Sequence, residues 1–174
     1  FFGGRSPFHQ QNRKQVISIA IQITLQEAYY GVEKSLRLNT QQGSRVVKLS
    51  IPKGIDTNNQ VQYDDLVDFA VLVVQFEVLQ DPKFERREQH LYCKQRISVL
   101  DLIAGTTVTV KTISGKELKV NIKPKTQPNS QIRISGEGMP IINTGQYGDQ
   151  FLIVDAFIPE NINQEIINCI ENNK

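Results

Sequence analysis

The chain has 174 residues, a formal net charge of +2, 39% hydrophobic residues and 22% charged residues. These values are ordinary for a globular protein, and the charge is too small for a dedicated nucleic-acid binder. No apolar run approaches the roughly 20 residues of a membrane-spanning helix, so the composition excludes that class.

Residues 1–13, FFGGRSPFHQQNR, mix Phe, Gly and polar residues without a period, which is typical of a flexible segment. The segment lacks the charged start and apolar core of a signal peptide. Because the sequence does not begin with Met, we expect it to be a piece of a longer chain.

The first regular element is predicted at 16–23, where isoleucine occupies every second position. This period of two is typical of a strand with one buried face. Thr24 and Glu27 then have the spacing of a capping box, and Gly31 follows where a left-handed residue ends a helix. We therefore expect one short helix directly after the strand.

Alternating apolar residues predict further strands at 36–38 and 47–51. Residues 69–79, FAVLVVQFEVL, are almost continuously apolar, which predicts a strand buried on both faces. After Asp81 and Pro82 the same order of elements returns. Strands are predicted at 90–97, 106–113, 116–122 and 151–157, and one capped helix is predicted at 98–104. Residues 160–172 place apolar side chains at helical spacing and predict an amphipathic helix.

The two halves of the sequence resemble each other. Ile23 aligns with Ile97 and Gly31 with Gly105, and 48–63 aligns with 119–134. Two units of about 70–75 residues are too long for a solenoid repeat and too few for an array. The predicted fold class is therefore mainly β: two tandem, similar β-sandwich-like domains, each with a short helix, plus a C-terminal helix.

Candidate catalytic and metal-binding groups are sparse. Cys93 and Cys169 lie far apart in sequence and cannot form a structural zinc site alone. His9 and His90 have no visible nucleophile partner. The acidic residues Asp64, Asp65 and Asp68 are interpreted as a solvated turn rather than a metal cluster. We expect no enzyme activity, no catalytic residue, no metal and no cofactor.

Several segments together resemble the C-terminal substrate-binding region of DnaJ-type (J-domain) co-chaperones. They are IQITLQEAYYGVEKSLRL, SIPKGI, DPKFERREQHLYCKQRISVLDLIAGTTVTV, TISGKELKVNIKPKTQPNSQIRISGEGMP and GDQFLIV. They appear in the family's order over roughly residues 16–172, and 1–13 resembles the end of the Gly/Phe linker that follows the J domain. Residues 39–46 stand where zinc-binding members insert cysteine repeats, and they contain no Cys. The chain is thus similar to the zinc-free class, which includes a curved-DNA-binding variant.

The resemblance implies a domain division and partners. The expected division is 1–13 linker, 14–80 client-binding domain I, 81–158 domain II and 159–174 dimerisation helix. The expected partners are unfolded or partly folded polypeptides, a second copy of the chain, and a DnaK-type ATPase chaperone reached through a J domain. The His-Pro-Asp motif of that J domain does not occur in this sequence. A cytoplasmic location is expected, without membrane binding.

The resemblance also implies a client pocket on domain I. Its lining is expected to be Ile19, Ile21, Lys34, Leu36, Leu38 and Val74. From the residues alone, the apolar ones are equally consistent with plain core. Lys34 is either the cationic edge of the pocket or a solvated charge. The small Val74 is expected to make a shallower pocket than an aromatic residue would.

The apolar side chains of the predicted C-terminal helix form a stripe that is expected to pair two chains. The residues of this C-terminal stripe are Ile162, Ile166, Cys169 and Ile170. The alternative is a helix folded back on its own second domain.

The alternative function is DNA binding by a basic face of domain II. A solvated sheet face explains the same basic residues. They are Lys111, Lys116, Lys119, Lys123, Lys125 and Arg133.

Overall fold

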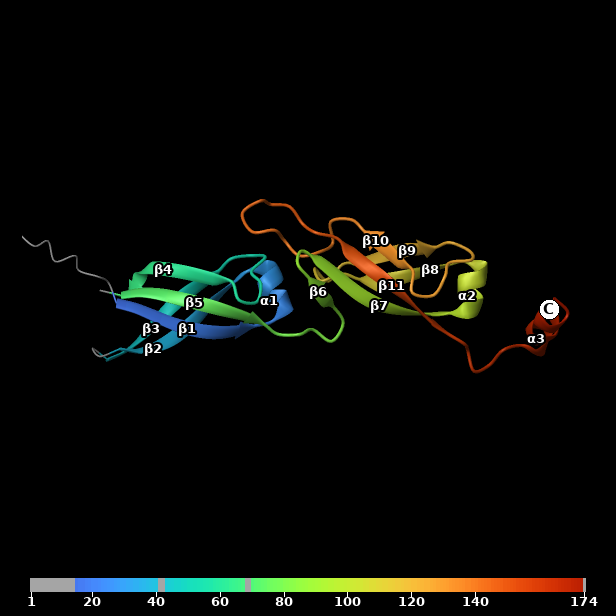
Figure 1. Cartoon of the computed structure of the whole chain (residues 1–174), viewed down its shortest axis with the longest axis horizontal. Coiled ribbons are helices and arrows are strands. Elements are labelled where there is room, and N and C mark those ends of the chain that lie inside the picture. The colour runs from blue at the N-terminus through green and yellow to red at the C-terminus, as the bar shows by residue number, and fades with distance from the viewer. Residues whose placement is uncertain (1–14, 41–42, 68–69, 174) are drawn as a thin grey trace, which may run out of the picture.

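The computed structural model describes residues 15–40, 43–67 and 70–173. The predicted linker at 1–13 and Asp68 lie outside these residues. The described chain is elongated, with two β-rich lobes end to end and a helix beyond the second lobe (Figure 1). The prediction of a mainly β fold built from two similar sandwich-like units with a C-terminal helix is confirmed.

The first lobe holds five strands and one helix. They are β1 (Gln15–Ile23), α1 (Leu25–Tyr30), β2 (Val32–Thr40), β3 (Gly43–Ile51), β4 (Gln60–Val67) and β5 (Ala70–Val78). One sheet has the order β1-β5-β4, and the β2–β3 hairpin forms a second layer. β1 and β5 are parallel, whereas β4 is antiparallel to β5.

The second lobe repeats this plan with one extra short strand. Its elements are β6 (Glu85–Arg87), β7 (His90–Ser98), α2 (Val99–Ala104), β8 (Thr106–Lys111), β9 (Glu117–Ile122), β10 (Gln131–Ile134) and β11 (Gln150–Phe157). The main sheet has the order β10-β11-β7-β6, with β7 parallel to β11, and β8–β9 is the second layer. α3 (Gln164–Glu171) follows. The limits proposed for the domains remain a prediction.

Both short helices begin and end as the sequence indicates. The Thr24 hydroxyl accepts from the Glu27 amide, and the Glu27 carboxylate accepts from the Thr24 amide at 2.8 Å, which completes the capping box. Ser98 caps α2 by accepting from the Asp101 amide. Gly31 and Gly105 end the helices at φ of 70° and 85°, a region that favours glycine. The resemblance between the two lobes therefore includes the residues that begin and end their short helices.

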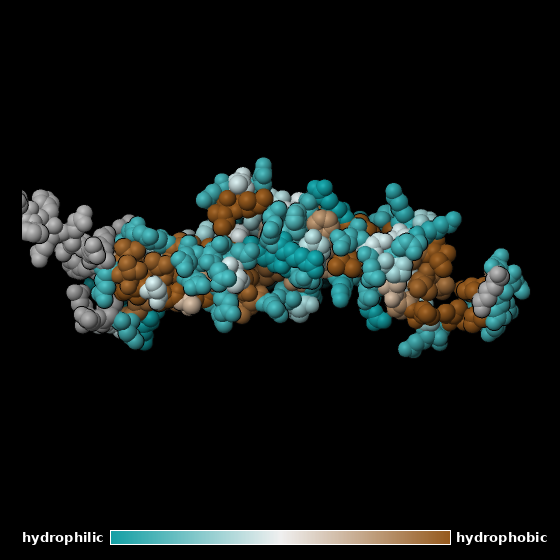
Figure 2. Space-filling model, viewed as in Figure 1, coloured by the Kyte–Doolittle hydropathy of each residue, from teal (hydrophilic) through white to brown (hydrophobic). Residues whose placement is uncertain are grey.

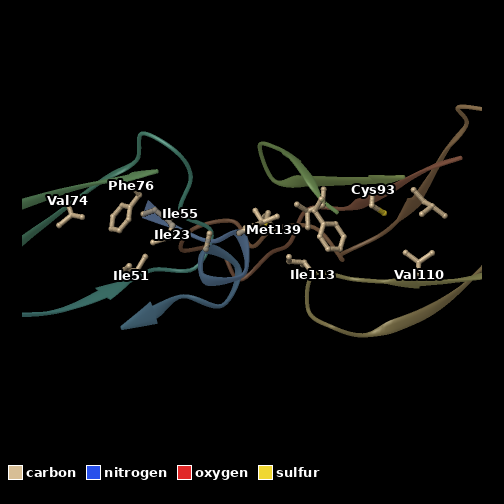
Figure 3. Packing of buried hydrophobic residues seen from close by; sticks show 14 of the residues in the cluster. Ile23, Ile51, Ile55, Val74, Phe76, Cys93, Val110, Ile113 and Met139 are labelled. Carbon is tan, nitrogen blue, oxygen red and sulfur yellow. The ribbon is translucent and has the colours of Figure 1, made fainter. Parts of the chain in front are cut away.

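The cores of the two lobes meet through Met139, which is fully buried. Figure 3 shows its side chain between Ile55 and Ile23 of the first lobe and Ile113 of the second. Beside it, Arg86 of β6 reaches back into the first lobe. Its guanidinium donates to the carbonyls of Ile55 at 2.6 Å and Gly54 at 3.0 Å. The lobes are thus joined by buried contacts as well as by the linking chain.

Two local predictions are wrong. β5 is buried on one face only: Leu72, Val74 and Phe76 point inward, while Gln75 and Glu77 are exposed. The hairpin covers a single face of this sheet, so the other face meets solvent. Asp64 and Asp65 do not form a turn but lie within β4, because β4 pairs with β5 across a register shift between Tyr63 and Val67.

Candidate functional site

The first lobe is closed on one side and open on the other. β3 contacts β4 on the closed side, where the Tyr63 hydroxyl donates to the Ser50 carbonyl at 2.7 Å. On the other side, β1 is the edge of its sheet and β2 is the outer strand of its hairpin (Figure 1). Among the described residues neither strand has a second neighbour, so two strand edges border this open side.

Four of the predicted client-binding residues lie together along this open side. Ile19 and Ile21 come from β1, and Leu36 and Leu38 come from β2. All four are half-buried and pack against the core cluster. The strand register shows which face of β1 points toward the core: Ile19 pairs with the buried Val74, so the two side chains share that face. We use the name first-lobe groove for these four residues with the two strand edges, as a label for the predicted client site.

Val74 does not contribute surface to the groove. Its side chain is 0% exposed and lies between its register partners, Ile19 of β1 and Val61 of β4. Both neighbours lie in the same sheet layer, which the β2–β3 hairpin covers. Val74 is therefore a core residue in the middle strand of this sheet.

Lys34 lies at the end of the groove next to α1 and is not a free cation. Its ammonium lies 3.0 Å from the Glu27 carboxylate and donates to the Gln22 carbonyl of β1 at 3.3 Å. The hydrogen bond from the Thr24 amide is the largest cause that lowers the pKa of Glu27; burial opposes it, and Lys34 lowers the pKa further. The capping box, the ion pair and the strand edge thus close this end of the groove.

A second apolar surface lies on the outer face of the same sheet, and the sequence reasoning missed it. Val16 of β1 is 62% exposed, and Val71 and Val73 of β5 are half-buried beside it. Figure 2 shows apolar surface over this lobe. The signal was present in the sequence as valines at alternating positions of 70–78, but the run was interpreted as buried on both faces.

The C-terminal stripe is only partly covered by its own chain. Ile162 and Ile166 are half-buried, while Cys169 and Ile170 are exposed, and none of the residues of α3 is buried. The helix lies beyond the second lobe (Figure 1), and Figure 2 shows apolar surface on both the helix and the neighbouring end of that lobe. The alternative of a helix packed back on its own domain is thus not observed.

The basic residues of the second lobe are partly neutralised. Lys111 pairs with Glu117 at 3.3 Å, Lys116 with Glu137 at 3.3 Å and Arg133 with Asp149 at 2.8 Å. The remaining three, Lys119, Lys123 and Lys125, are exposed. Half of the cluster is thus paired with carboxylates, which lowers the net positive charge of this face.

Two features of other functional classes are missing from the residues that the structure describes. No group of three His, Cys, Asp or Glu side chains is placed to hold a metal ion. No helix within 15–40, 43–67 or 70–173 is long and apolar enough to cross a membrane.

The described residues form a tandem pair of similar β-sandwich-like units, each with one short helix. Residues 17–159 match the family model of the DnaJ C terminal domain, so the chain belongs to that family. β2 and β3 pair directly from Thr40 to Gly43, without a cysteine-rich insertion between them.

Curated relatives are proteins called Chaperone protein DnaJ. The one from Clostridium tetani is 35% identical over 126 residues, which is 68% of this chain and 33% of the relative. The one from Borrelia garinii subsp. bavariensis is 32% identical over 133 residues, or 72% of this chain and 36% of the relative. The one from Lactobacillus acidophilus is 30% identical over 133 residues, with 72% and 34% covered. The chain thus spans about a third of the length of these relatives.

Proposed function

We propose that this chain is the client-binding part of a co-chaperone, and that it holds exposed hydrophobic segments of unfolded proteins in the first-lobe groove. The observation that carries the proposal is the row of half-buried Ile19, Ile21, Leu36 and Leu38 between two strand edges. An extended client segment would add a strand to one edge and insert alternate side chains between the two layers. The chain acts by binding and not by catalysis.

Magnitudes indicate a weak, fast-releasing site. Burying one client Leu or Phe side chain contributes roughly 1.5–3 kcal/mol, whereas a complex with a millimolar Kd already needs about 4 kcal/mol. One groove is therefore a poor binder unless strand addition contributes as well. Two grooves in a dimer would raise the apparent affinity through effective concentration.

The dimer in this proposal forms through α3. Helix α3 is amphipathic; Ile166 is half-buried and Ile170 is 53% exposed in the single chain. A partly uncovered apolar helix face favours a partner surface. The clients would then be handed to a DnaK-type ATPase chaperone in the cytoplasm through a J domain that this sequence does not contain.

The test is a fluorescence anisotropy titration of a labelled apolar peptide with the parent chain and two variants. Leu36→Glu places a carboxylate inside the groove, and Val46→Glu places the same group on the outer face of the hairpin, where Val46 is 64% exposed. We expect Leu36→Glu to weaken binding by about tenfold or more, because a charge must be buried with the client, and Val46→Glu to leave it unchanged. Equal binding by a folded Leu36→Glu chain would remove the groove as the client site.

A further inference from the structure

The outer face of the β1-β5-β4 sheet carries an apolar patch at the end where β1 and β5 begin. Val16 of β1 is 62% exposed, its register partner is Val71 of β5, and Val73 follows on the same face. We call these three valines the outer-face patch. Further along β5 this face carries the exposed Gln75 and Glu77, so the apolar surface of β5 is limited to one end. Figure 2 shows apolar surface at this end of the lobe.

We propose that the outer-face patch is the docking site of the chain's own N-terminal segment, residues 1–14, with the Phe8 ring lying over Val71 and Val73. Residues 1–14 lie outside the described residues. The proposal does not rest on client binding, because the first-lobe groove is on the opposite face of the same sheet.

The place where β1 begins puts this segment beside the patch. Gln15 directly precedes Val16 and lies at the same end of the sheet as Val71, because β1 and β5 are parallel. Phe8 stands seven positions before Gln15, and an extended chain of that length reaches about 23 Å. The patch extends only about 5 Å across the two strands and about 7 Å along β5. The segment is therefore long enough to turn back and place Phe8 on the patch.

The sequence of the segment indicates which side chain docks. Phe8 is the apolar aromatic residue nearest to β1, and residues 9–12 between them are polar. Pro7 directly before it is a residue typical of turns. An aromatic ring on β-branched side chains is a favourable pair on a sheet surface. The valines of the patch are thus a suitable surface for Phe8.

Charge complementarity favours the same contact. Asp64 of β4 is exposed, and its carboxylate accepts at 2.7 Å from the side-chain amide of Gln62, the register partner of Val73. Asp64 forms no ion pair within the part of the chain that the structure describes. The N-terminal segment contains basic residues and no acidic one, so the carboxylate beside the patch attracts it. The basic residues are Arg5, Arg13 and Lys14.

The covalent connection makes a weak contact sufficient. A short flexible connection gives Phe8 an effective concentration at the patch on the order of millimolar. A contact too weak to form between separate molecules is then populated within one chain. The same residues supplied as a free peptide should consequently leave the patch largely unoccupied.

The test uses a fluorescent reporter at the docking residue. The chain contains no Trp, so Phe8→Trp in the full chain introduces a single indole. The measurement is quenching of its fluorescence by acrylamide, and the reference is a synthetic peptide of residues 1–14 with the same Trp. We expect quenching in the chain to be about threefold weaker than in the peptide, because a docked ring is shielded from solvent. Equal quenching in the chain and the peptide would overturn the proposal.

Matched variants locate the contact. In the Phe8→Trp chain, Val73→Thr adds a hydroxyl to the patch and keeps the β-branched shape. The control is Val46→Thr, the same change at a 64% exposed position of the β2–β3 hairpin. We expect Val73→Thr to increase quenching about twofold, because apolar contact with the indole is lost, and Val46→Thr to leave it unchanged. No effect of Val73→Thr, or equal effects of both changes, would refute the patch as the docking site.

Other occupants of the patch give different results. Docking within one chain predicts quenching that is independent of chain concentration, whereas quenching that weakens as the concentration rises would assign the patch to a second copy and overturn the proposal. Leu36→Glu should leave the quenching unchanged, because Leu36 lies in the first-lobe groove. Loss of client binding with the Trp still shielded would end the proposed function alone, and a fully quenched Trp with client binding intact would end this proposal alone.

Discussion

Arg86 gives the sharpest prediction about how the two lobes are held together. Its side chain is 11% exposed, and it donates to the carbonyls of Ile55 and Gly54 in the first lobe and to the Glu88 carbonyl in its own lobe. It also lies 3.4 Å from the Asp56 carboxylate. Burial lowers the pKa of the guanidinium, and Asp56 opposes that shift, but an Arg remains charged at any working pH.

Replacing Arg86 with Ala removes three hydrogen bonds from a charged donor. Each such bond contributes roughly 1.5–3 kcal/mol net, and bonds made by one side chain are not additive. Water can reach part of the site, since the Asp56 side chain is 41% exposed. We therefore expect Arg86→Ala to lower the free energy of unfolding by about 3 kcal/mol, which corresponds to a fall in Tm of roughly 6–12 °C for a chain of this size.

Urea unfolding followed by circular dichroism measures this change. The matched control is Arg87→Ala, because the neighbouring Arg87 is exposed, pairs with Glu85 of its own strand and lies over the Tyr92 ring. We expect the control to unfold almost like the parent. A loss below about 1 kcal/mol for Arg86→Ala, or equal losses for both variants, would refute the account of Arg86 as the link between the lobes.

Three further changes test other parts of the structure. Gly54→Ala should destabilise the junction, because Gly54 has φ +87° and a Cβ there would overlap the Pro140 carbonyl oxygen; thermal unfolding checks this, and an unchanged Tm would contradict it. The pKa of Glu27 is lowered in the folded chain, so the contribution of its carboxylate to stability is present above about pH 4.3 and is lost as the pH falls through the lowered folded pKa. The Glu27→Gln variant should therefore lose less stability than the parent on acidification. Identical dependence of stability on acid pH in the two chains would disprove this. Ile166→Asp with Ile170→Asp should give monomers by light scattering, and a dimeric mass would argue against α3 as the dimer contact.

The sequence predicted the elements that depend on local signals. Alternating isoleucines gave β1, and the Thr24–Glu27 spacing gave the capping box that the structure contains. It also predicted the inward rows that hold Leu36 and Leu38, since a strand's period of two fixes which residues share a face. Whether these rows bind a client stays a prediction.

Features that depend on distant pairing could not be predicted. The parallel pairing of β1 with β5 joins segments more than fifty residues apart, and no local period encodes it. β6 has three residues, too few for a period to appear. The ion pair of Lys34 could not be predicted from the sequence either, because Glu27 contacts Lys34 only when α1 and β2 lie side by side.

The most direct test of the first-lobe groove is a map of backbone amide chemical shifts while an apolar peptide is titrated into the labelled chain. The account predicts that the largest changes fall on Ile19, Ile21, Leu36 and Leu38 and on the adjoining edges of β1 and β2. Changes centred instead on the outer-face residues Val16, Val71 and Val73, or no saturable change in the first lobe, would contradict it.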